Sequence, residues 1–216
     1  MTIKVYEGIP LIIFQVLKVL VKNLQSRGFE AYYCQDKTQA LEKALALIPE
    51  GSTVGWGGCL SAQQIGLIDA VKAGNYQAID RNDEPTPEGK TRAMKRCLTA
   101  DVFLCGANGL SLDGQMVSVD GNGNRVAAMA YGPDSVIVIA GMNKVFDTLD
   151  DAMVRARTVA APMNQQRFCG KTPCTTTGAC GNCKSPECIC NQILITRNCR
   201  PAGRIKFVLV GEELGF

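Results

Sequence analysis

A tract of closely spaced cysteines carries the most visible chemistry in this sequence. Seven of its eleven cysteines lie between residues 169 and 199. The most specific motif has the spacing C-x5-C-x2-C-x6-C and consists of Cys174, Cys180, Cys183 and Cys190. Four thiolates can bind a tetrahedral zinc ion or a [4Fe–4S] cluster, and the number of ligands does not separate the two. The interleaved Gly, Pro and Thr residues indicate a loop folded around a bound group.

The other thiols leave several alternatives open. Cys188 could replace Cys190 as a ligand, because the two point in opposite directions in an extended segment. Cys169 and Cys199 flank the loop and could be spare ligands, a redox pair or structural residues. The tract as a whole could instead form disulfides or contain inert thiols. Cys34, Cys97 and Cys105 are expected to be ordinary cysteines, whereas Cys59 precedes a predicted helix, a position that can lower a thiol pKa.

The composition excludes several classes of function. The chain contains no histidine, which rules out Ser-His-Asp and Cys-His catalysis, so a soft-metal site must consist of thiolates, with or without a carboxylate. Its 23 Lys and Arg residues are spread along the chain beside 20 Asp and Glu residues. Since no basic block stands out, we expect no nucleic-acid partner.

An apolar stretch near the start does not predict a membrane segment. Residues 9–24 are rich in Leu, Ile and Val, but Lys18 and Lys22 interrupt them and no small-residue cleavage site follows. We therefore expect neither a membrane span nor a signal peptide, and a cytoplasmic protein. The wide apolar band of this helix fits a deeply packed core helix or one that is shared with a second subunit in a homodimer. Cytoplasmic thiols stay reduced, so a dense cluster favours metal or redox chemistry.

Glycine turns and polar residues after several predicted strands indicate a site for a small anion. A strand that is followed by a glycine turn and the start of a helix can bind an anion. Arg125 could also bind a carboxylate or phosphate. The simpler interpretation is a set of tight structural turns with a solvated arginine. The candidate residues are Gly57, Gly58, Ser61, Asp120, Asn124, Arg125, Gly141, Asn143 and Lys144.

The pattern of hydrophobic residues predicts the elements that position these sites. We expect helices over 10–28, 38–48, 61–73, 90–98 and 148–160, and strands over 29–34, 52–56, 76–80, 101–105, 135–140 and 205–210. Polar pairs predict caps at the starts of three of these helices: Asp36 with Gln39, Ser61 with Gln64 and Thr148 with Asp151. Residues 108–123 predict a hairpin excursion. Alternating strands and helices predict a layered α/β fold with a mostly parallel sheet. Residues 1–216 would form a single domain, with the cysteine-rich loop 169–199 inserted before the last strand.

Four segments resemble one known family. GWGGCLSAQQIGL, DVFLCGANGLSLDGQMVSVDGNGNRVAAMAYGP, VIVIAGMNKV and the tail TPC…GACGNC…IC are similar to the LUD-domain (lactate-utilisation) family over nearly the whole chain. The resemblance implies the NagB/RpiA/CoA-transferase-like fold of ribose-5-phosphate isomerase, glucosamine-6-phosphate deaminase and the CoA transferases. It also implies a part in an iron–sulfur system that oxidises lactate to pyruvate. Cys59, Ser61 and Gln64 depart from the family's Gly-Gly-Ser-x-Thr turn and its following glutamate, which weakens any acid–base role for this loop.

Three functional hypotheses follow. The first is a lactate-utilisation protein that takes part in the oxidation of lactate or a related organic acid, with a small anionic ligand at the strand ends and a [4Fe–4S] or zinc centre. The second is a transferase, isomerase or ligase for a phosphorylated or CoA-linked substrate, with structural zinc. The third is a non-catalytic subunit that docks an iron–sulfur protein partner.

Overall fold

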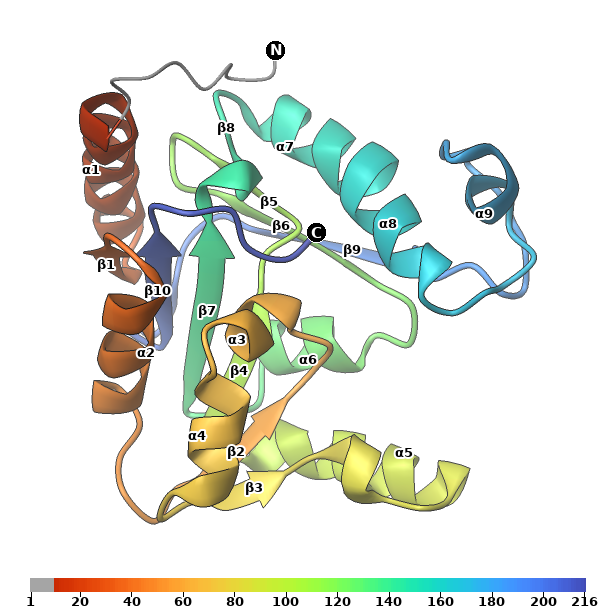
Figure 1. The fold of residues 1–216 in the computed structure, drawn as a ribbon, viewed down its shortest axis with the longest axis horizontal. Helices are drawn as coiled ribbons and strands as arrows, with labels where there is room; N and C mark the ends of the chain where they lie inside the picture. Colours follow the sequence, from red (N-terminus) through yellow and green to blue (C-terminus); the bar gives the residue numbers. More distant parts are fainter. Residues whose placement is uncertain (1–9) are drawn as a thin grey trace.

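The centre of the structure, a computed structural model that describes residues 10–216, is a six-stranded sheet (Figure 1). Its strands follow the order β1 (Glu30–Cys34), β10 (Ile205–Val210), β7 (Ser135–Gly141), β4 (Val102–Gly106), β2 (Thr53–Trp56) and β3 (Gln77–Ile79). Every neighbouring pair is parallel, as the alternation of strands and helices predicts. Residue 9 of the apolar stretch lies outside the described residues.

Helices cover both faces of this sheet, because its central strands are apolar on both sides. Val136 and Val138 of β7 face one core with α1 (Pro10–Ser26), α5 (Pro87–Arg96) and α6 (Asn124–Ala130). Ile137 and Ile139 face the opposite core with α2 (Lys37–Ala46), α3 (Leu60–Gln64) and α4 (Leu67–Ala73). The carboxyl ends of the parallel strands therefore remain as the edge at which loops and ligand sites can form.

A second, four-stranded sheet lies beside that edge. Its order is β8 (Val145–Phe146), β5 (Gly109–Ser111), β6 (Met116–Asp120) and β9 (Gln192–Thr196). The predicted hairpin excursion supplies β5 and β6, and the final part of the predicted cysteine-rich loop supplies β9, which pairs antiparallel with β6. The cysteine tract is thereby attached to the body of the protein through this sheet.

One long helical rod covers the second sheet and leads into the cysteine tract (Figure 1). It consists of α7 (Leu149–Arg155), a π-helical segment η4 (Ala156–Ala160) and α8 (Ala161–Gln166), and the short helix α9 (Pro173–Thr177) follows it. Ala152, Ala156 and Ala161 pack against Val117 and Val119 of β6. Short 3₁₀ turns complete the chain: η1 (Arg81–Asp83), η2 (Cys97–Thr99) and η3 (Met142–Lys144).

Several predicted helices differ in detail from the structure. The predicted helix over 61–73 is two helices, α3 and α4, because Gly66 adopts a φ of +78° between them. The prediction of a capping box at Ser61 and Gln64 is also wrong. The residue before α3 is Cys59, and its side chain makes no capping hydrogen bond. Asn124 begins α6 where the sequence indicated only turns. By contrast, the predicted caps Asp36 and Thr148 accept hydrogen bonds from the backbone N–H groups of Gln39 (2.9 Å) and Asp151 (3.1 Å).

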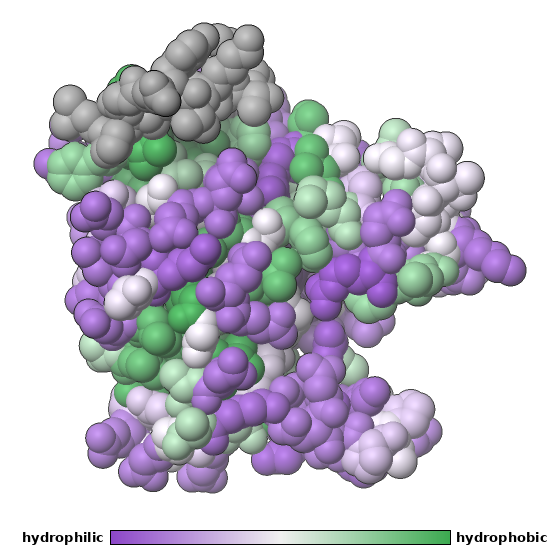
Figure 2. All heavy atoms as spheres, viewed as in Figure 1, coloured by the Kyte–Doolittle hydropathy of each residue, from purple (hydrophilic) through white to green (hydrophobic). Residues whose placement is uncertain are grey.

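The surface in the view of Figure 2 is largely hydrophilic, with a notch between the part that includes α5 and the projecting part that includes α9. None of the helices within residues 10–216 combines the length and the apolar character that crossing a bilayer requires.

Candidate functional site

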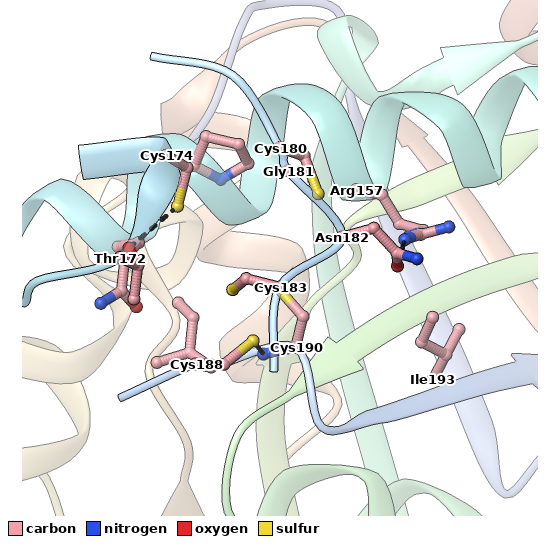
Figure 3. A pocket seen from close by; sticks show the side chains of 13 residues that line it. Arg157, Thr172, Cys174, Cys180, Gly181, Asn182, Cys183, Cys188, Cys190 and Ile193 are labelled. Atoms are coloured by element: carbon pink, nitrogen blue, oxygen red, sulfur yellow. Dashed lines mark hydrogen bonds between the residues drawn. The ribbon is translucent and has the colours of Figure 1, made fainter. Parts of the chain in front are cut away.

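Five thiols of the cysteine tract line a single cavity of about 290 Å³ (Figure 3). They are Cys174, Cys180, Cys183, Cys188 and Cys190. The four residues of the predicted motif and the alternative ligand Cys188 therefore come together. Across the described residues, which include all eleven cysteines, every thiol is free.

Local structure holds the first of these thiols in place. Thr172 and Thr175 form a capping box at the start of α9, and the Thr175 hydroxyl accepts the N–H of Thr172 at 3.1 Å. Cys174 therefore lies in the first turn of α9, where the Thr172 hydroxyl is 3.2 Å from its sulfur. The Gln166 amide of α8 donates to the Cys174 carbonyl at 3.2 Å, which attaches α9 to the end of the rod.

The thiols of the last part of the tract influence one another. The backbone N–H of Cys190 donates to the Cys188 sulfur at 3.4 Å. Burial raises the pKa of Cys190 to about 12, and the nearby thiols of Cys188, Cys180 and Cys174 add to this effect. Thiolates at such close range repel one another, so together they need a positively charged partner to remain deprotonated.

The donor set suits a soft metal or an iron–sulfur cluster, because it consists of sulfur alone. Tetrahedral zinc with bonds of about 2.3 Å would require sulfurs about 3.8 Å apart. Among the residues that the structure describes, no three His, Cys, Asp or Glu side chains have the arrangement of a single-ion site. The five thiols instead line the walls of a cavity.

Two cysteines of the tract lie apart from the thiol cavity. Cys169 is exposed and has a φ of +50°, and it lines a separate depression beside Lys171 and Thr175. Cys199 is buried, and its sulfur accepts the N–H of Ile205 at 3.2 Å, at the start of β10. Of the roles that the sequence left open for this residue, a structural one matches its position.

A second cluster of functional groups lies at the carboxyl ends of β4 and β7, and its members are cations. Lys144 is 4% exposed and donates from Nζ to the Ala107 carbonyl at 3.1 Å. Arg155 is 7% exposed and donates to the Asn108 carbonyl (2.7 Å) and to the backbone oxygen of Phe216 (2.8 Å), the last residue of the sequence. We call these two side chains and Arg125 the strand-end cations.

Arg125 approaches the same segment from α6. Its Nη2 donates to the Asn108 side-chain oxygen (2.8 Å) and to the Val119 carbonyl (2.5 Å). Its side chain also lies against Gly57, where a Cβ would come within 3.1 Å of the Arg125 Cδ. Gly57 thus allows Arg125 to reach Asn108, and the three strand-end cations converge on Ala107 and Asn108.

Burial controls the ionisation of this cluster. It lowers the pKa of Lys144 to about 8, with Arg155 and Arg125 acting in the same direction and Cys59 against them. Burial also lowers the pKa of Arg155. Burial raises the pKa of Cys59, although the N–H groups of Ala62 and Ser61 and the nearby cations oppose the rise. Cys59 is therefore a protonated thiol at neutral pH, and the sequence-based idea of a lowered pKa does not apply.

The remaining predicted anion-binding residues have different positions. Ser61 is buried inside α3, and Asn143 accepts the N–H of Leu214 at 3.1 Å. Gly141 ends β7, Gly58 lies near Arg81, and Asn124 is the first residue of α6. The Asp120 carboxylate accepts the backbone N–H groups of Arg125 (2.8 Å) and Val126 (3.1 Å). It thus caps the first backbone N–H groups of α6 and does not face the cations.

Sequence reasoning missed Arg155. Its position was nevertheless detectable, because Arg155 follows Ala152 by three residues and precedes Ala156 on the buried face of the rod. A cation on the apolar face of a helix indicates a buried charge with a local function.

The thiol cavity and the strand-end cations are connected. The rod carries Arg155 at the strand ends and Arg157 at the cavity, where Arg157 donates to the Asn182 side-chain oxygen at 2.6 Å. After the last thiols, Asn191 donates its backbone N–H to the Asp120 carbonyl and its amide to the Gly121 carbonyl, both at 3.0 Å. Asp120 in turn positions Arg125.

The fold and these two sites define a layered α/β protein with a cationic strand-end site and a cavity lined by thiols. The chain belongs to the LUD domain family, which is related to lactate utilisation and whose model matches residues 17–210. No curated protein matches the sequence.

One solved structure supports the fold, and two others show a weaker similarity. A DUF162 family protein from Deinococcus radiodurans is similar over 92% of this chain and 97% of its own, with a TM-score of 0.52 at 12% identity. Ribose 5-phosphate isomerase from Plasmodium falciparum is similar over 51% of this chain and 52% of its own (TM-score 0.31, 14% identity). The delta subunit of eIF2B from Chaetomium thermophilum is similar over 69% and 60% (TM-score 0.36, 14% identity).

Proposed function

We propose that this protein takes part in the cytoplasmic oxidation of lactate or a related organic acid. In this proposal the strand-end cations hold the acid through its carboxylate, and four thiolates of the cavity hold a [4Fe–4S] cluster. The observation that carries the proposal is the gathering of five thiols around one cavity in a chain of the LUD domain family.

Support for an anionic ligand comes from Lys144 and Arg155. Both are almost completely buried. Lys144 donates to the neutral Ala107 carbonyl, and Arg155 donates to the neutral Asn108 carbonyl and to the backbone oxygen of Phe216. A carboxylate would be a stronger acceptor for both groups, because hydrogen bonds between charged partners are roughly twice as strong as neutral ones. Ser61 and Asn143 lie against the same final segment of the chain as Lys144 and could donate further hydrogen bonds.

Support for a cluster comes from the thiol cavity. Its donors are sulfurs, its volume exceeds what one metal ion requires, and Cys174, Cys180, Cys183 and Cys190 supply one ligand for each iron. When bound, a [4Fe–4S] cluster supplies one-electron transfer. The positively charged Arg157 on the cavity wall would offset part of the negative charge of four thiolates.

The electron count requires a partner. Oxidation of a 2-hydroxy acid to a 2-oxo acid releases two electrons and two protons, and one cluster accepts a single electron at a time. The proposal therefore includes an iron–sulfur protein as the further electron acceptor. At alkaline pH, Lys144 in its neutral form could accept one of the protons, since its pKa is about 8.

The first test is the metal content of the protein. Purified without oxygen, the chain should be brown and contain about four iron and four sulfide per chain. Cys180→Ser and Cys183→Ser should lose the visible absorption, whereas Cys169→Ser, a matched change in a thiol outside the cavity, should retain it. Zinc in place of iron, or no metal, would contradict the cluster assignment.

The second test is turnover. The iron-loaded chain should reduce an artificial electron acceptor in the presence of lactate or a related hydroxy acid, and Arg155→Gln should abolish this rate. Should the loaded chain fail to turn over any such acid even with its natural iron–sulfur partner added, the assignment to organic-acid oxidation is wrong.

A further inference from the structure

β9 is an edge strand that lacks the usual protection against pairing. Among residues 10–216 its one neighbour in the sheet is β6. Its five residues, Gln192–Thr196, include no charged residue, proline or glycine, and Ile193 and Ile195 are 43% and 40% exposed. Unpaired N–H and C=O groups at a sheet edge can pair with another strand, so native proteins usually protect an edge with charges, prolines or a covering segment. β9 therefore presents an apolar edge that is open to pairing.

The other edge strands within the described part of the chain are less suited to pairing. β1 begins with Glu30, whose carboxylate accepts a hydrogen bond from the Tyr32 hydroxyl at 2.7 Å. β3 and β8 contain only three and two residues. Short edge strands and charged side chains both oppose pairing with another chain. β9 is thus the edge at which pairing is most favourable.

The ladder between β6 and β9 shows which backbone groups of β9 are unpaired. An antiparallel strand directs its N–H and C=O groups to one side and then the other at alternate residues. The Asp120 carbonyl accepts the N–H of Asn191, so the backbone of Asp120 faces β9. Its ladder partner Gln192, and every second residue after it, must then face β6. The N–H and C=O groups of Ile193 and Ile195 therefore point away from β6, into the open edge.

Contacts on both sides limit this open stretch. The Arg197 carbonyl, just after β9, accepts a hydrogen bond from the Arg27 guanidinium at 3.1 Å. Before β9, the Asn191 side-chain amide donates to the Gly121 carbonyl at 3.0 Å. The stretch that remains free is therefore centred on Leu194.

The sequence of the free stretch, QILIT, is complementary to a reversed copy of itself. A second copy in antiparallel orientation, centred on Leu194, places Ile193 opposite Ile195 of the partner subunit and Ile195 opposite the partner's Ile193. Because these residues face outward, each pair can exchange two backbone hydrogen bonds. The isoleucine side chains of both copies then lie on one face of the sheet and pack against each other.

The charges beside β9 favour this antiparallel arrangement over a parallel one. With Leu194 at the centre, Arg197 lies opposite the uncharged Asn191 of the partner subunit. In a parallel pair, Arg197 would instead lie opposite the partner's Arg197. Like charges directly opposite each other destabilise a sheet, so the parallel pair is unfavourable.

We propose that β9 pairs with β9 of a second copy of this chain, antiparallel and about a two-fold axis at Leu194. Two four-stranded sheets then join into one continuous sheet of eight strands. The partner's Ile195 lies beside Ile193, whose side chain lines the thiol cavity (Figure 3). The two thiol cavities of the dimer therefore lie on the same face of the shared sheet. The inference does not depend on the metal or the ligand of the proposed function.

The first measurement is the mass of the metal-free full chain in solution, by analytical ultracentrifugation over a range of concentrations. We expect a reversible equilibrium between monomer and dimer with a Kd in the micromolar range, because a single pair of strands is a small interface. A monomer at every concentration would overturn the proposal. Larger oligomers would overturn it as well, because a two-fold pairing closes after two copies.

A charge within the strand should oppose the pairing. Ile195→Lys should weaken dimerisation at least about tenfold, since it places an amine opposite the apolar side chain of Ile193. Val19→Lys is the matched control, the same kind of change at a side chain of α1 that is 48% exposed, and it should dimerise like the unchanged protein. A dimer that is lost with Val19→Lys and kept with Ile195→Lys would mean that the copies share α1 and that the proposal is wrong.

A pair of double variants tests the register. When Ile193→Glu is combined with Ile195→Lys, each introduced carboxylate lies opposite an introduced amine of the other copy. This protein should dimerise at least about threefold more tightly than Ile193→Lys combined with Ile195→Lys, in which amines lie opposite amines. In a parallel pair, position 193 lies opposite position 193 and like charges meet in both proteins. Equal dimerisation of the two double variants would therefore overturn the antiparallel pairing at Leu194.

Hydrogen exchange of the unchanged protein gives a test that does not depend on the folding of any variant. The N–H groups of Ile193 and Ile195 should exchange severalfold more slowly above the Kd of the dimer than below it, because pairing protects them. Amides of β10, at the centre of the main sheet, should exchange equally at both concentrations. Equal exchange at Ile193 and Ile195 as well would show that β9 is not the dimer interface.

Discussion

Lys144 places an amine in a position where water is almost excluded. Because its folded-state pKa is about 8, below its ordinary value of 10.5, the folded protein binds fewer protons between these two values than the unfolded chain does. This group therefore makes the free protein more stable as pH rises through that window. At pH values below the window, the whole penalty of burying its charge is present.

This relation predicts how the unfolding free energy of the Lys144→Met variant depends on pH. Relative to the unchanged protein, the variant should lose on the order of 3 kcal/mol of unfolding free energy between about pH 7 and about pH 10.5, because only the unchanged protein gains there. Urea denaturation of both proteins at the two pH values measures the difference. An equal difference at both values would show that the amine ionises normally in the folded state.

At the scale of residues, the sequence predicted the grouping of the sulfurs better than the grouping of the charges. The spacing of the thiols grouped Cys174, Cys180, Cys183 and Cys190, which do line one cavity, while metal binding by them stays a prediction. The position of Arg155 depends on which helix face is buried. The role of Asp120 depends on the start of α6, which the glycine-rich sequence around it did not indicate. Both require tertiary contacts that a single sequence does not specify.

At the scale of elements, Gly66 divides one predicted helix into two. Its φ of +78° is unfavourable for residues with a Cβ, although the nearest atom to an added Cβ, in Leu41, is 3.9 Å away. Gly66→Ala should therefore lower the unfolding free energy by about 1 kcal/mol through backbone strain alone, and Gly66→Asn by less. Urea denaturation checks this order, and equal stability of all three proteins would mean that the chain relaxes to a continuous helix.

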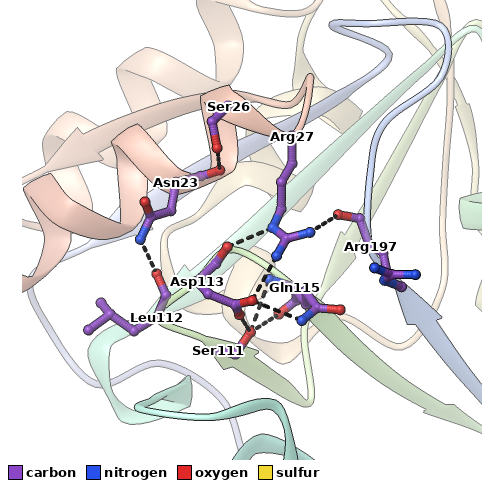
Figure 4. Close-up of polar contacts among 8 residues, drawn as sticks. All are labelled: Asn23, Ser26, Arg27, Ser111, Leu112, Asp113, Gln115 and Arg197. Atoms are coloured by element: carbon purple, nitrogen blue, oxygen red, sulfur yellow. Dashed lines mark hydrogen bonds and ion pairs between the residues drawn. The ribbon is translucent and has the colours of Figure 1, made fainter.

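A polar junction joins the end of α1 to the tip of the β5–β6 hairpin (Figure 4). The Arg27 guanidinium donates to the Asp113 carbonyl (2.6 Å), the Asp113 carboxylate (2.7 Å) and the Arg197 carbonyl (3.1 Å). Partial burial would raise the pKa of Asp113, but hydrogen bonds from Ser111 and Gln115 together with Arg27 lower it overall. The junction fixes the second sheet to the first helix.

Arg27→Gln should therefore destabilise the protein by about 1 kcal/mol near neutral pH. Because the folded pKa of Asp113 is lowered, its contribution is present above the ordinary pKa of 3.8 and is lost as pH falls through the folded value. The effect of the variant should thus shrink in urea denaturation as the pH falls below 3.8. Arg92→Gln, on exposed α5, is the control and should be neutral at both pH values.

At the scale of the whole molecule, the order of elements predicted the parallel sheet, because strands that are apolar on both faces need helices on both sides. The pairing of β9 with β6 was not predictable, since β9 is a short strand at the end of a loop rich in cysteine, glycine and proline. That pairing places the thiol cavity beside the strand-end site, although more than forty residues separate Arg125 from Cys174 along the chain.

Metal loading should accordingly change the hydrogen-exchange protection of backbone amides that lie at a distance from the thiols. The N–H of Asn191 bonds to Asp120, and we expect its hydrogen exchange to slow severalfold when the cavity is loaded with iron and to accelerate after chelation. Amides of β10, in the centre of the main sheet, should exchange equally in both forms. Identical exchange at Asn191 in both forms would show that the cavity does not influence the segment that positions Arg125.

The π-helical segment between Arg155 and the thiol cavity has an evolutionary consequence. A π turn holds one residue more than an α turn, so deletion of the single codon for Val159 would restore an ordinary helix. Arg155 before the segment, and Pro162 and Gln165 after it, would keep the faces that they now occupy. One three-base event could therefore regularise the rod without separating the two halves of this molecule's chemistry, and the length of this segment is free to differ by one residue among descendants.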